Sequence, residues 1–238
     1  MLELKNIYKT FNPGTINEKR ALNGLNLKLN EGDFVTVTKE FPGIIANDDI
    51  TLQLKKGEIH ALLGENGAGK STMLNAVAGT WPVDEGQILI DNIDVTKLSE
   101  HKRATYLGRV FQDPMTGTAA TMGIEENLAL AKRRGKSRLL RSGITKAERE
   151  EYKELLKILG LGLEDRLTSK VGLLSGGQRQ ALTLLMATLQ KPKLLLLDEH
   201  TAALDPKTAA KVLEITDMIV NRDHLTTLMI THNMKDAI

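Results

Sequence analysis

Two hydrophobic patterns alternate along most of the chain. One has the spacing of an amphipathic helix and covers residues 70–78, 124–131, 145–159, 177–189 and 206–220. The other is a short apolar run, found at residues 87–90, 107–111, 194–197 and 225–230. Short apolar runs between helices are typical of parallel strands that are buried on both faces. The pattern therefore predicts an α/β fold built on a mostly parallel, doubly wound sheet.

The alternation stops between residues 122 and 169, where helical patterns follow one another without an intervening strand. A run of helices without strands adds nothing to the parallel sheet, so it indicates a separate layer or subdomain. We assign residues 112–175 to a helical subdomain. It is inserted into a core that residues 38–111 and 176–238 form together.

The N-terminal region repeats itself. Residues 25–29 and 34–37 alternate polar and apolar positions around a Glu31-Gly32 turn, which is typical of a β-hairpin. Residues 50–54 and 59–63 repeat this pattern about 25 positions later. We interpret residues 1–37 as a duplicated β segment. Only the second copy runs on into the rest of the core, so we expect residues 1–30 to form a marginal extra edge or to stay mobile.

Composition narrows the possible functions. The 238 residues are 41% hydrophobic, and 32 basic against 30 acidic residues leave a net charge of +2. Near-neutral charge and an aromatic content of 3% argue against a nucleic-acid partner. Absence of cysteine excludes disulfides and thiolate chemistry. No apolar run approaches the roughly 18 residues that a membrane span needs, so any membrane role is expected to be peripheral.

The stretch from Gly64 to Ser71, GENGAGKS, matches a phosphate-binding loop. It follows the predicted strand at 59–63 and opens the predicted helix at 70–78, which is the context that this motif requires. Glycines let backbone N–H groups face the phosphates, Lys70 supplies a cation, and Ser71 offers a hydroxyl to Mg²⁺. We expect Mg²⁺ and the β and γ phosphates of a nucleotide as ligands, and the family resemblance described below implies that this nucleotide is ATP. The contacting residues would be Gly64, Asn66, Gly67, Gly69, Lys70, Ser71 and Thr72.

Polar residues follow three of the apolar runs at their carboxyl ends. Asp198 and Glu199 end the run at 194–197, Gln112 follows the one at 107–111, and His232 follows the one at 225–230. Parallel strands bring their carboxyl ends to one edge of the sheet, where ligands bind. Asp198 would hold Mg²⁺ through water, and Glu199 would orient or deprotonate the attacking water. Gln112 would reach both metal and water, and His232 would contact the γ-phosphate.

A second candidate anion site lies at residues 174–178, LSGGQ, ahead of the helical pattern that ends at Leu189. Ser175 is placed to cap that helix, and the glycines leave backbone N–H groups accessible. This stretch resembles the signature motif of ABC-type ATPases. With the phosphate loop, LLLLDE at 194–199, ALD at 203–205, Gln112 and His232, it completes six motifs in the order of that family, over about residues 38–238.

The resemblance implies a P-loop NTPase core of the RecA-like type, an N-terminal antiparallel β subdomain and an inserted helical subdomain. It also implies that two such subunits close head to tail on ATP, either as a homodimer or as a pair with a different ATPase subunit. Ser175, Gly177 and Gln178 would contact nucleotide held by the partner, Asp205 would signal between the sites, and Phe41 would stack on adenine. Phe41 is alternatively an ordinary core residue at the end of a strand.

The same resemblance implies an ATP-hydrolysing subunit of a bacterial importer, bound peripherally to an integral membrane permease at the cytoplasmic face of the plasma membrane. An extracytoplasmic solute-binding protein would take part indirectly. One alternative is a nucleotide-binding module with impaired turnover, because of the duplication and because the chain stops six residues after His232. Another is a soluble ABC protein of DNA repair or translation, although those usually carry coiled coils or two ATPase domains.

Two features depart from this expectation. His200 stands where the family usually has proline, and we expect little effect from it. A basic run covers residues 132–138. It is expected to coat a solvated surface, with contact to anionic lipid headgroups or a partner as the alternative.

Overall fold

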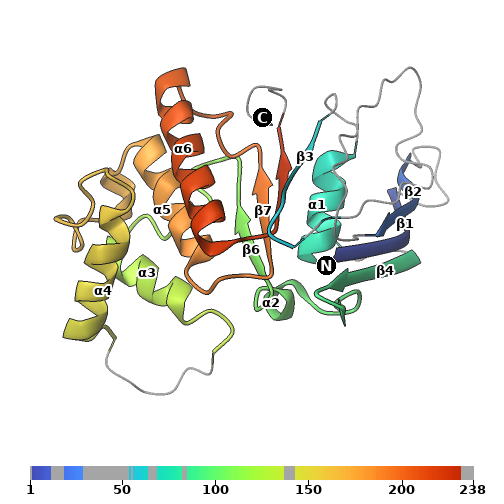
Figure 1. The fold of residues 1–238 in the computed structure, drawn as a ribbon, viewed down its shortest axis with the longest axis horizontal. Helices are drawn as coiled ribbons and strands as arrows, with labels where there is room; N and C mark the ends of the chain where they lie inside the picture. Colours follow the sequence, from blue (N-terminus) through green and yellow to red (C-terminus); the bar gives the residue numbers. More distant parts are fainter. Residues whose placement is uncertain are drawn as a thin grey trace.

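The computed structural model describes residues 2–11, 19–28, 54, 56–63, 69–81, 85–136 and 143–231. Within these ranges the chain forms two four-stranded sheets and a set of helices (Figure 1). The strands are β1 (Leu2–Phe11), β2 (Lys19–Lys28), β3 (Ile59–Leu62), β4 (Glu85–Ile90), β5 (Ile93–Asp94), β6 (Leu107–Val110), β7 (Leu194–Asp198) and β8 (Thr227–Ile230). The helices are α1 (Lys70–Ala78), α2 (Glu100–Arg103), α3 (Ile124–Lys132), α4 (Lys146–Lys157), the 3₁₀ turn η1 (Val171–Leu173), α5 (Gly176–Thr188) and α6 (Pro206–Asp223).

The parallel sheet has the order β3-β8-β7-β6, and every neighbouring pair in it is parallel. The inner strand β7 shows why residues 194–197 are all apolar. Leu194 and Leu196 pack into one hydrophobic cluster, whereas Leu195 and Leu197 pack into another. Successive side chains point to opposite faces of a strand, so a strand covered on both sides must be apolar throughout. The predicted doubly wound sheet is confirmed.

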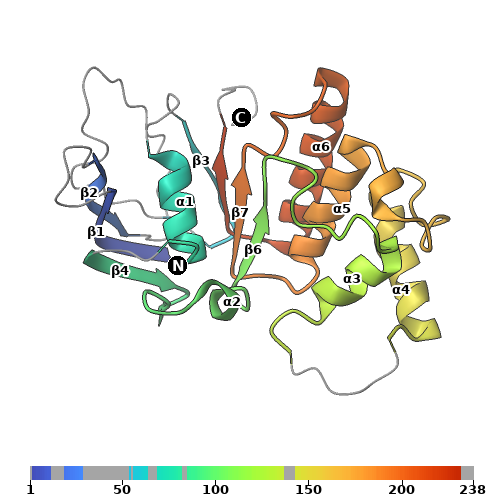
Figure 2. The same ribbon diagram turned by 180° about the vertical axis from the view of Figure 1, so that it is seen from behind.

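Helices cover both faces of this sheet. On one side α1 lies between the parallel and the antiparallel sheet, and its Leu74 and Val77 share a cluster with Ile88 of β4 (Figures 1 and 2). On the other side α5 and α6 pack through residues such as Leu185 and Ile219. The phosphate-loop motif precedes α1 directly in sequence, so the packing of this helix between the sheets fixes where the chain leaves that motif.

The antiparallel sheet has the order β2-β1-β4-β5 and corrects the expectation for residues 1–30. β1 pairs with both neighbours, with Leu4 opposite Leu27 of β2 and Ile88 of β4, so of the two N-terminal strands only β2 lies at an edge of the sheet. The second copy sends β3 into the parallel sheet, which leaves the place beside β4 open to β1. Pairing there satisfies backbone groups that an exposed β4 edge would leave unpaired.

The sequence predicts a hairpin of residues 25–29 and 34–37, whereas the structure pairs β1 with β2. β2 contains most of the first predicted strand but pairs with β1, upstream of it, in antiparallel register. The second predicted strand of that hairpin, residues 34–37, lies outside the described residues, as do Phe41 and residues 50–53. The proposed boundary between residues 37 and 38 stays a prediction.

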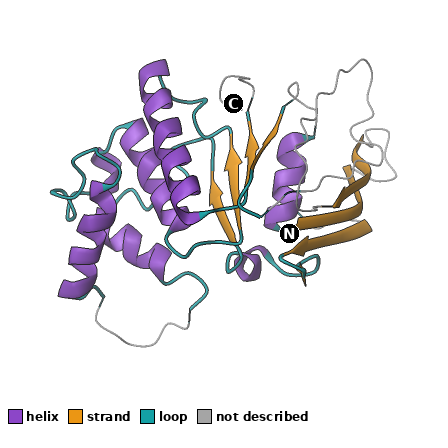
Figure 3. Ribbon diagram, in the orientation of Figure 1, coloured by secondary structure: helices purple, strands orange, loops and turns teal. Residues whose placement is uncertain are grey.

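Between β6 and β7 the described residues contain helices and one isolated bridge, from Gly123 to Lys170, in agreement with the predicted helical insertion (Figure 3). α4 begins after Thr145, whose hydroxyl accepts the backbone N–H of Glu148 while the Glu148 carboxylate accepts that of Thr145. This reciprocal cap defines where the helix begins. Tyr152 and Leu156 then anchor α4 in the core.

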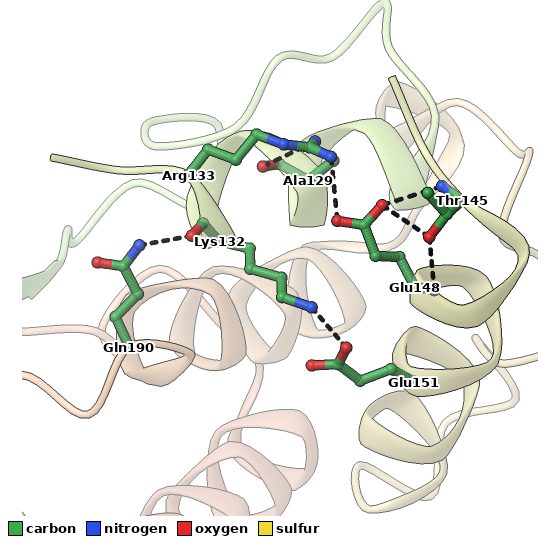
Figure 4. Close-up of polar contacts among 7 residues, drawn as sticks. All are labelled: Ala129, Lys132, Arg133, Thr145, Glu148, Glu151 and Gln190. Atoms are coloured by element: carbon green, nitrogen blue, oxygen red, sulfur yellow. Dashed lines mark hydrogen bonds and ion pairs between the residues drawn. The ribbon is translucent and has the colours of Figure 1, made fainter. Parts of the chain in front are cut away.

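The start of the basic run is partly exposed, as expected of a solvated surface, but it also forms contacts within the protein that the sequence did not predict. Lys132 pairs with Glu151 at 2.5 Å, and Arg133 pairs with Glu148 at 3.0 Å, so both basic residues tie α3 to α4 (Figure 4). Arg134 donates to the Ala187 carbonyl at the end of α5. Residues 137 and 138 lie outside the described residues.

Candidate functional site

The carboxyl edge of the parallel sheet gathers the predicted polar residues. In register, Val110 of β6 lies beside Leu197 of β7, and Asp198 lies beside Ile230 of β8. Gln112 thus follows β6 at the same level at which Glu199 follows β7. The Gln112 amide donates to Glu199 Oε2 at 3.4 Å. His232 lies outside the described residues, although β8 ends at the same edge.

Helix α1 brings a cation to this edge. It begins at Lys70, directly after Gly69, whose φ of 79° belongs to the left-handed region that glycine adopts most easily. Burial lowers the pKa of Lys70, and the neighbouring Glu199 and Asp198 carboxylates oppose that shift. Lys70 is therefore close enough to both carboxylates to interact with them. Gly64, Asn66 and Gly67 of the same loop lie outside the described residues.

Asp198 occupies the centre of the site. Burial raises the pKa of its carboxyl group most strongly, the Arg109 guanidinium lowers it, Glu199 raises it, and a hydrogen bond from Ser71 lowers it. The Ser71 hydroxyl and the Asp198 carboxylate are thus direct neighbours. Two hard oxygen donors side by side fit Mg²⁺. Across the described ranges, no group of three or more His, Cys, Asp or Glu side chains is arranged so that it could hold a metal ion.

Glu199 has an unusual backbone conformation. Its φ of 46° lies in the left-handed region, where any residue other than glycine is strained by about 1 kcal/mol or more. Neighbours hold it there: its N–H donates to the Ile230 carbonyl at 3.0 Å, and its carbonyl accepts the Ala202 N–H at 2.9 Å. Such over-determined strain is common where a side chain must be presented at a functional edge.

His200, directly after Glu199, points into the protein and is only 1% exposed. Its Nε2 lies 3.1 Å from the Thr216 hydroxyl of α6, and that hydroxyl donates onward to the Val212 carbonyl. The imidazole is therefore the donor in this pair. Burial lowers the pKa of His200 to about 4, so the ring is neutral at physiological pH. Proline could not form this link to α6, but the effect on function stays a prediction.

Arg109 is a site residue that we did not single out from the sequence. Its Nη2 lies 3.6 Å from Asp198 Oδ2 and donates to Asn75 Oδ1 of α1 at 2.8 Å. Burial lowers the pKa of this guanidinium, and Asp198 followed by Glu100 opposes the shift. An arginine inside the otherwise apolar run at 107–111 was the available signal, since a charge in a buried strand needs a partner.

The signature stretch forms the expected helix start. The Ser175 hydroxyl accepts the Gln178 N–H at 3.2 Å, and Gln178 Oε1 accepts the Ser175 N–H at 3.2 Å. Gly177 faces α6 so closely that an added Cβ would lie 2.1 Å from Thr208 Cγ2. Asp205 caps α6 by accepting the Thr208 N–H at 3.1 Å. The two helix starts are therefore packed against each other, with Ser175 and Asp205 exposed.

A family profile described as ABC transporter matches residues 47–202. The chain belongs to the ABC transporter family as an ATP-binding subunit. It is 46% identical over 191 residues to a tyrosine transport ATP-binding protein of Clostridioides difficile, covering 80% of this chain and 76% of that protein. It is 38% identical over 203 residues to a methionine import ATP-binding protein of Rhizobium johnstonii, covering 84% of this chain and 53% of that protein. The chain thus spans about half the length of the methionine relative.

Solved ABC cassettes have the same fold. A dimeric ATP-binding cassette in a post-hydrolysis state, bound to ADP and Pi, is 29% identical with a TM-score of 0.74, covering 100% of this chain and 90% of that one. These similarities confirm the P-loop NTPase fold and the family. In the family ATP is the bound nucleotide, and its members are ATPases in general. None of the helices within the described residues is both long and apolar enough to cross a bilayer.

Proposed function

We propose that this ABC subunit hydrolyses ATP at the carboxyl edge of its parallel sheet and so powers solute uptake through a separate membrane permease. The observation that carries the proposal is the convergence of Lys70, Ser71, Gln112, Asp198 and Glu199 at one edge. They come from the start of α1 and the ends of β6 and β7. Far apart in sequence, they supply a cation, metal ligands and a base in one place.

Lys70 and the metal ligands act on the phosphates. Lys70 neutralises charge on the β and γ oxygens, and Gly64, Asn66, Gly67, Gly69 and Thr72 complete the loop around them. Ser71, Asp198 and Gln112 would hold Mg²⁺, which would supply positive charge to neutralise the phosphates. The oxygen donors at Ser71 and Asp198 support this role.

Glu199 acts on the attacking water. The water oxygen forms a bond to the γ-phosphorus, the bond from that phosphorus to the bridging oxygen of ADP breaks, and the water proton passes to the Glu199 carboxylate. Gln112 orients the same water, which its contact with Glu199 supports. His232 contacts the γ-phosphate from the end of β8.

ATP binding closes two subunits head to tail. Ser175, Gly177 and Gln178 of one subunit reach the nucleotide of the other through the start of α5, which is a favourable place for an anion. Asp205 lies beside that start and links the two sites. Phe41 stacks on adenine. The exposed start of α5 and the dimeric solved cassette support this arrangement.

The transport direction is import, and the solute is an amino acid or a similar small molecule. Relatives whose names refer to tyrosine transport and methionine import support this assignment. The subunit would lie peripherally at the cytoplasmic face of the membrane beneath a permease, served by an extracytoplasmic solute-binding protein. The permease would dock beside Gln112 and the helical subdomain.

The test is Glu199→Gln. We expect this variant to bind ATP as the unchanged protein does, to lose at least about a hundredfold in hydrolysis, and to accumulate an ATP-bound dimer on size exclusion. Glu151→Gln on the exposed side of α4 is the matched control and should hydrolyse normally. Tight ATP binding without turnover in the unchanged protein would instead favour the nucleotide-binding module without hydrolysis.

A further inference from the structure

Arg109 links three elements that surround the candidate metal site. From β6, its guanidinium donates to Asn75 Oδ1 of α1 at 2.8 Å and to Thr80 Oγ1 just after α1 at 3.2 Å. The same group lies 3.6 Å from Asp198 Oδ2 on β7 and 4.5 Å from the ring centre of Phe111. A planar guanidinium held at this many points has little freedom to turn.

The register of the sheet produces this contact. Arg109 lies opposite Leu196 in the parallel pair of β6 and β7. Asp198 is two residues further along β7, so it shares the face of Leu196. Arg109 and Asp198 are only 14% and 17% exposed. Their contact is thus a partly buried charge pair on the α1 side of the sheet, next to the Ser71 hydroxyl that also binds Asp198.

A second buried arginine shows what a purely structural role looks like. Arg103 is 1% exposed and donates to four backbone carbonyls, two of them at the end of α1. All of its nitrogens have acceptors, as a structural group should. In Arg109 the Nε–H has no acceptor among the described residues, and one nitrogen faces a carboxylate. Its burial is thus less well compensated by local hydrogen bonds.

We propose that Arg109 is a positioning residue that holds the Asp198 carboxylate in place for the Mg²⁺ of the bound nucleotide. The inference rests on the proposed metal role of Asp198. Because Arg109 and Ser71 both contact it, the Asp198 carboxylate is oriented without a bound metal. Groups that orient a metal-binding carboxylate commonly change metal affinity about 10- to 100-fold when they are removed.

Removing Arg109 has two opposing effects on the metal. Loss of orientation weakens Mg²⁺ binding, whereas loss of a nearby positive charge strengthens it. Only the first effect acts through Asp198. A double-mutant cycle between the two residues therefore separates them, because an effect that passes through Asp198 disappears once that carboxylate is gone.

The experiment measures binding of a fluorescent ATP analogue to the full chain during Mg²⁺ titration and in EDTA. Arg109→Met should raise the Mg²⁺ concentration at half-saturation about tenfold and leave binding in EDTA within about twofold. In an Asp198→Asn background the same substitution should change the half-saturating concentration less than about twofold. Arg134→Met is the matched control, because it removes another partly buried guanidinium, bound to the Ala187 carbonyl away from the site.

Three results would overturn the proposal: an equal Mg²⁺ shift in both backgrounds, tighter Mg²⁺ binding by Arg109→Met, or no shift at all. If Asp198→Asn alone leaves the Mg²⁺ dependence unchanged, the proposed metal role of Asp198 fails instead. Asn75→Ala keeps the test open should Arg109→Met not fold. It loosens the guanidinium without removing its charge, so it should shift the Mg²⁺ titration in the same direction, and an unchanged titration would contradict the proposal.

Discussion

Charged residues are arranged in opposite ways at the carboxyl edge of the parallel sheet and between α3 and α4. At the edge, burial is the largest influence on Lys70, Arg109 and Asp198, and it shifts each pKa against the charged form. In the α3–α4 region, hydrogen bonds are the largest influence: one from Arg149 lowers the pKa of Glu125, and one from the Thr145 backbone N–H at the start of α4 lowers the pKa of Glu148. At the edge of the sheet, the folded structure disfavours the charged forms of Lys70, Arg109 and Asp198. Between α3 and α4, the folded structure favours the charged forms of Glu125 and Glu148.

The difference indicates which charges serve a ligand. A charged group whose burial is only partly compensated by the protein gains most when an oppositely charged ligand arrives. Under the proposed function, the ligands at the edge are phosphates and Mg²⁺, whereas Glu125 and Glu148 already have hydrogen-bond partners within the protein. Substitutions at the edge should therefore change binding more than stability, and substitutions between the helices should do the reverse.

Lys70→Ala should produce the largest effect. Losing one partner of a desolvated charge pair costs roughly 2 to 5 kcal/mol, so we expect ATP affinity to fall at least about thirtyfold. The free energy of unfolding should stay the same or rise, because burial disfavours the charged amine. Calorimetric titration and urea unfolding measure the two quantities. Lys132→Ala is the control, and a similar loss of ATP affinity there would erase the contrast.

Glu125→Gln should produce the next largest effect, on stability. The Glu125 carboxylate is 9% exposed and receives Arg149 at 2.5 and 2.9 Å from two nitrogens. We expect the free energy of unfolding to fall by about 1 to 2 kcal/mol, with ATP affinity unchanged. Urea unfolding measures the loss.

Acid should remove this contribution. The hydrogen bond from Arg149 holds the pKa of Glu125 below its ordinary value of 4.5. A carboxylate with a lowered folded pKa stabilises the fold fully above its unfolded pKa, and the contribution is lost as pH falls through the folded pKa. The stability difference between the unchanged protein and Glu125→Gln should therefore shrink below about pH 4.5. A difference that stays constant on acidification would contradict the role of the charge.

Glu151→Gln should produce the smallest effect. Its pair with Lys132 is short, but the two side chains are 51% and 29% exposed. Exposed pairs contribute about 0 to 1 kcal/mol and are screened by salt. We expect a loss of at most about 0.5 kcal/mol that disappears in 1 M salt. A larger loss of unfolding free energy that persists in 1 M salt would show that the Lys132–Glu151 pair behaves like the more buried Arg149–Glu125 pair.

Much of the core and part of the site could be predicted from short sequence windows. The helix start at Lys70, the run ending in Asp198 and Glu199, and the Ser175 cap are local patterns, and each lies at the predicted strand or helix end. Helix starts are local because their caps reach only three residues ahead. Contacts of Phe41, the first loop residues and His232 stay predictions.

Other features could not be predicted, because they join residues far apart in sequence. The place of β1 beside β4 depends on which strand the second copy sends into the parallel sheet. The buried link from His200 to Thr216 depends on how α6 returns across the sheet. The basic run contacts α4 and α5 only because helix packing brings them within reach.

The sequence by itself determined the family, the alternation of strands and helices and the local motifs, because periodicity and motif spacing follow from neighbours along the chain. Tertiary structure alone decided that Arg109 meets Asp198, 89 positions away (198 minus 109), and that β1 lies inside a sheet. The physical reason is strand register: which side chains share a face and a level is decided only when distant strands pair.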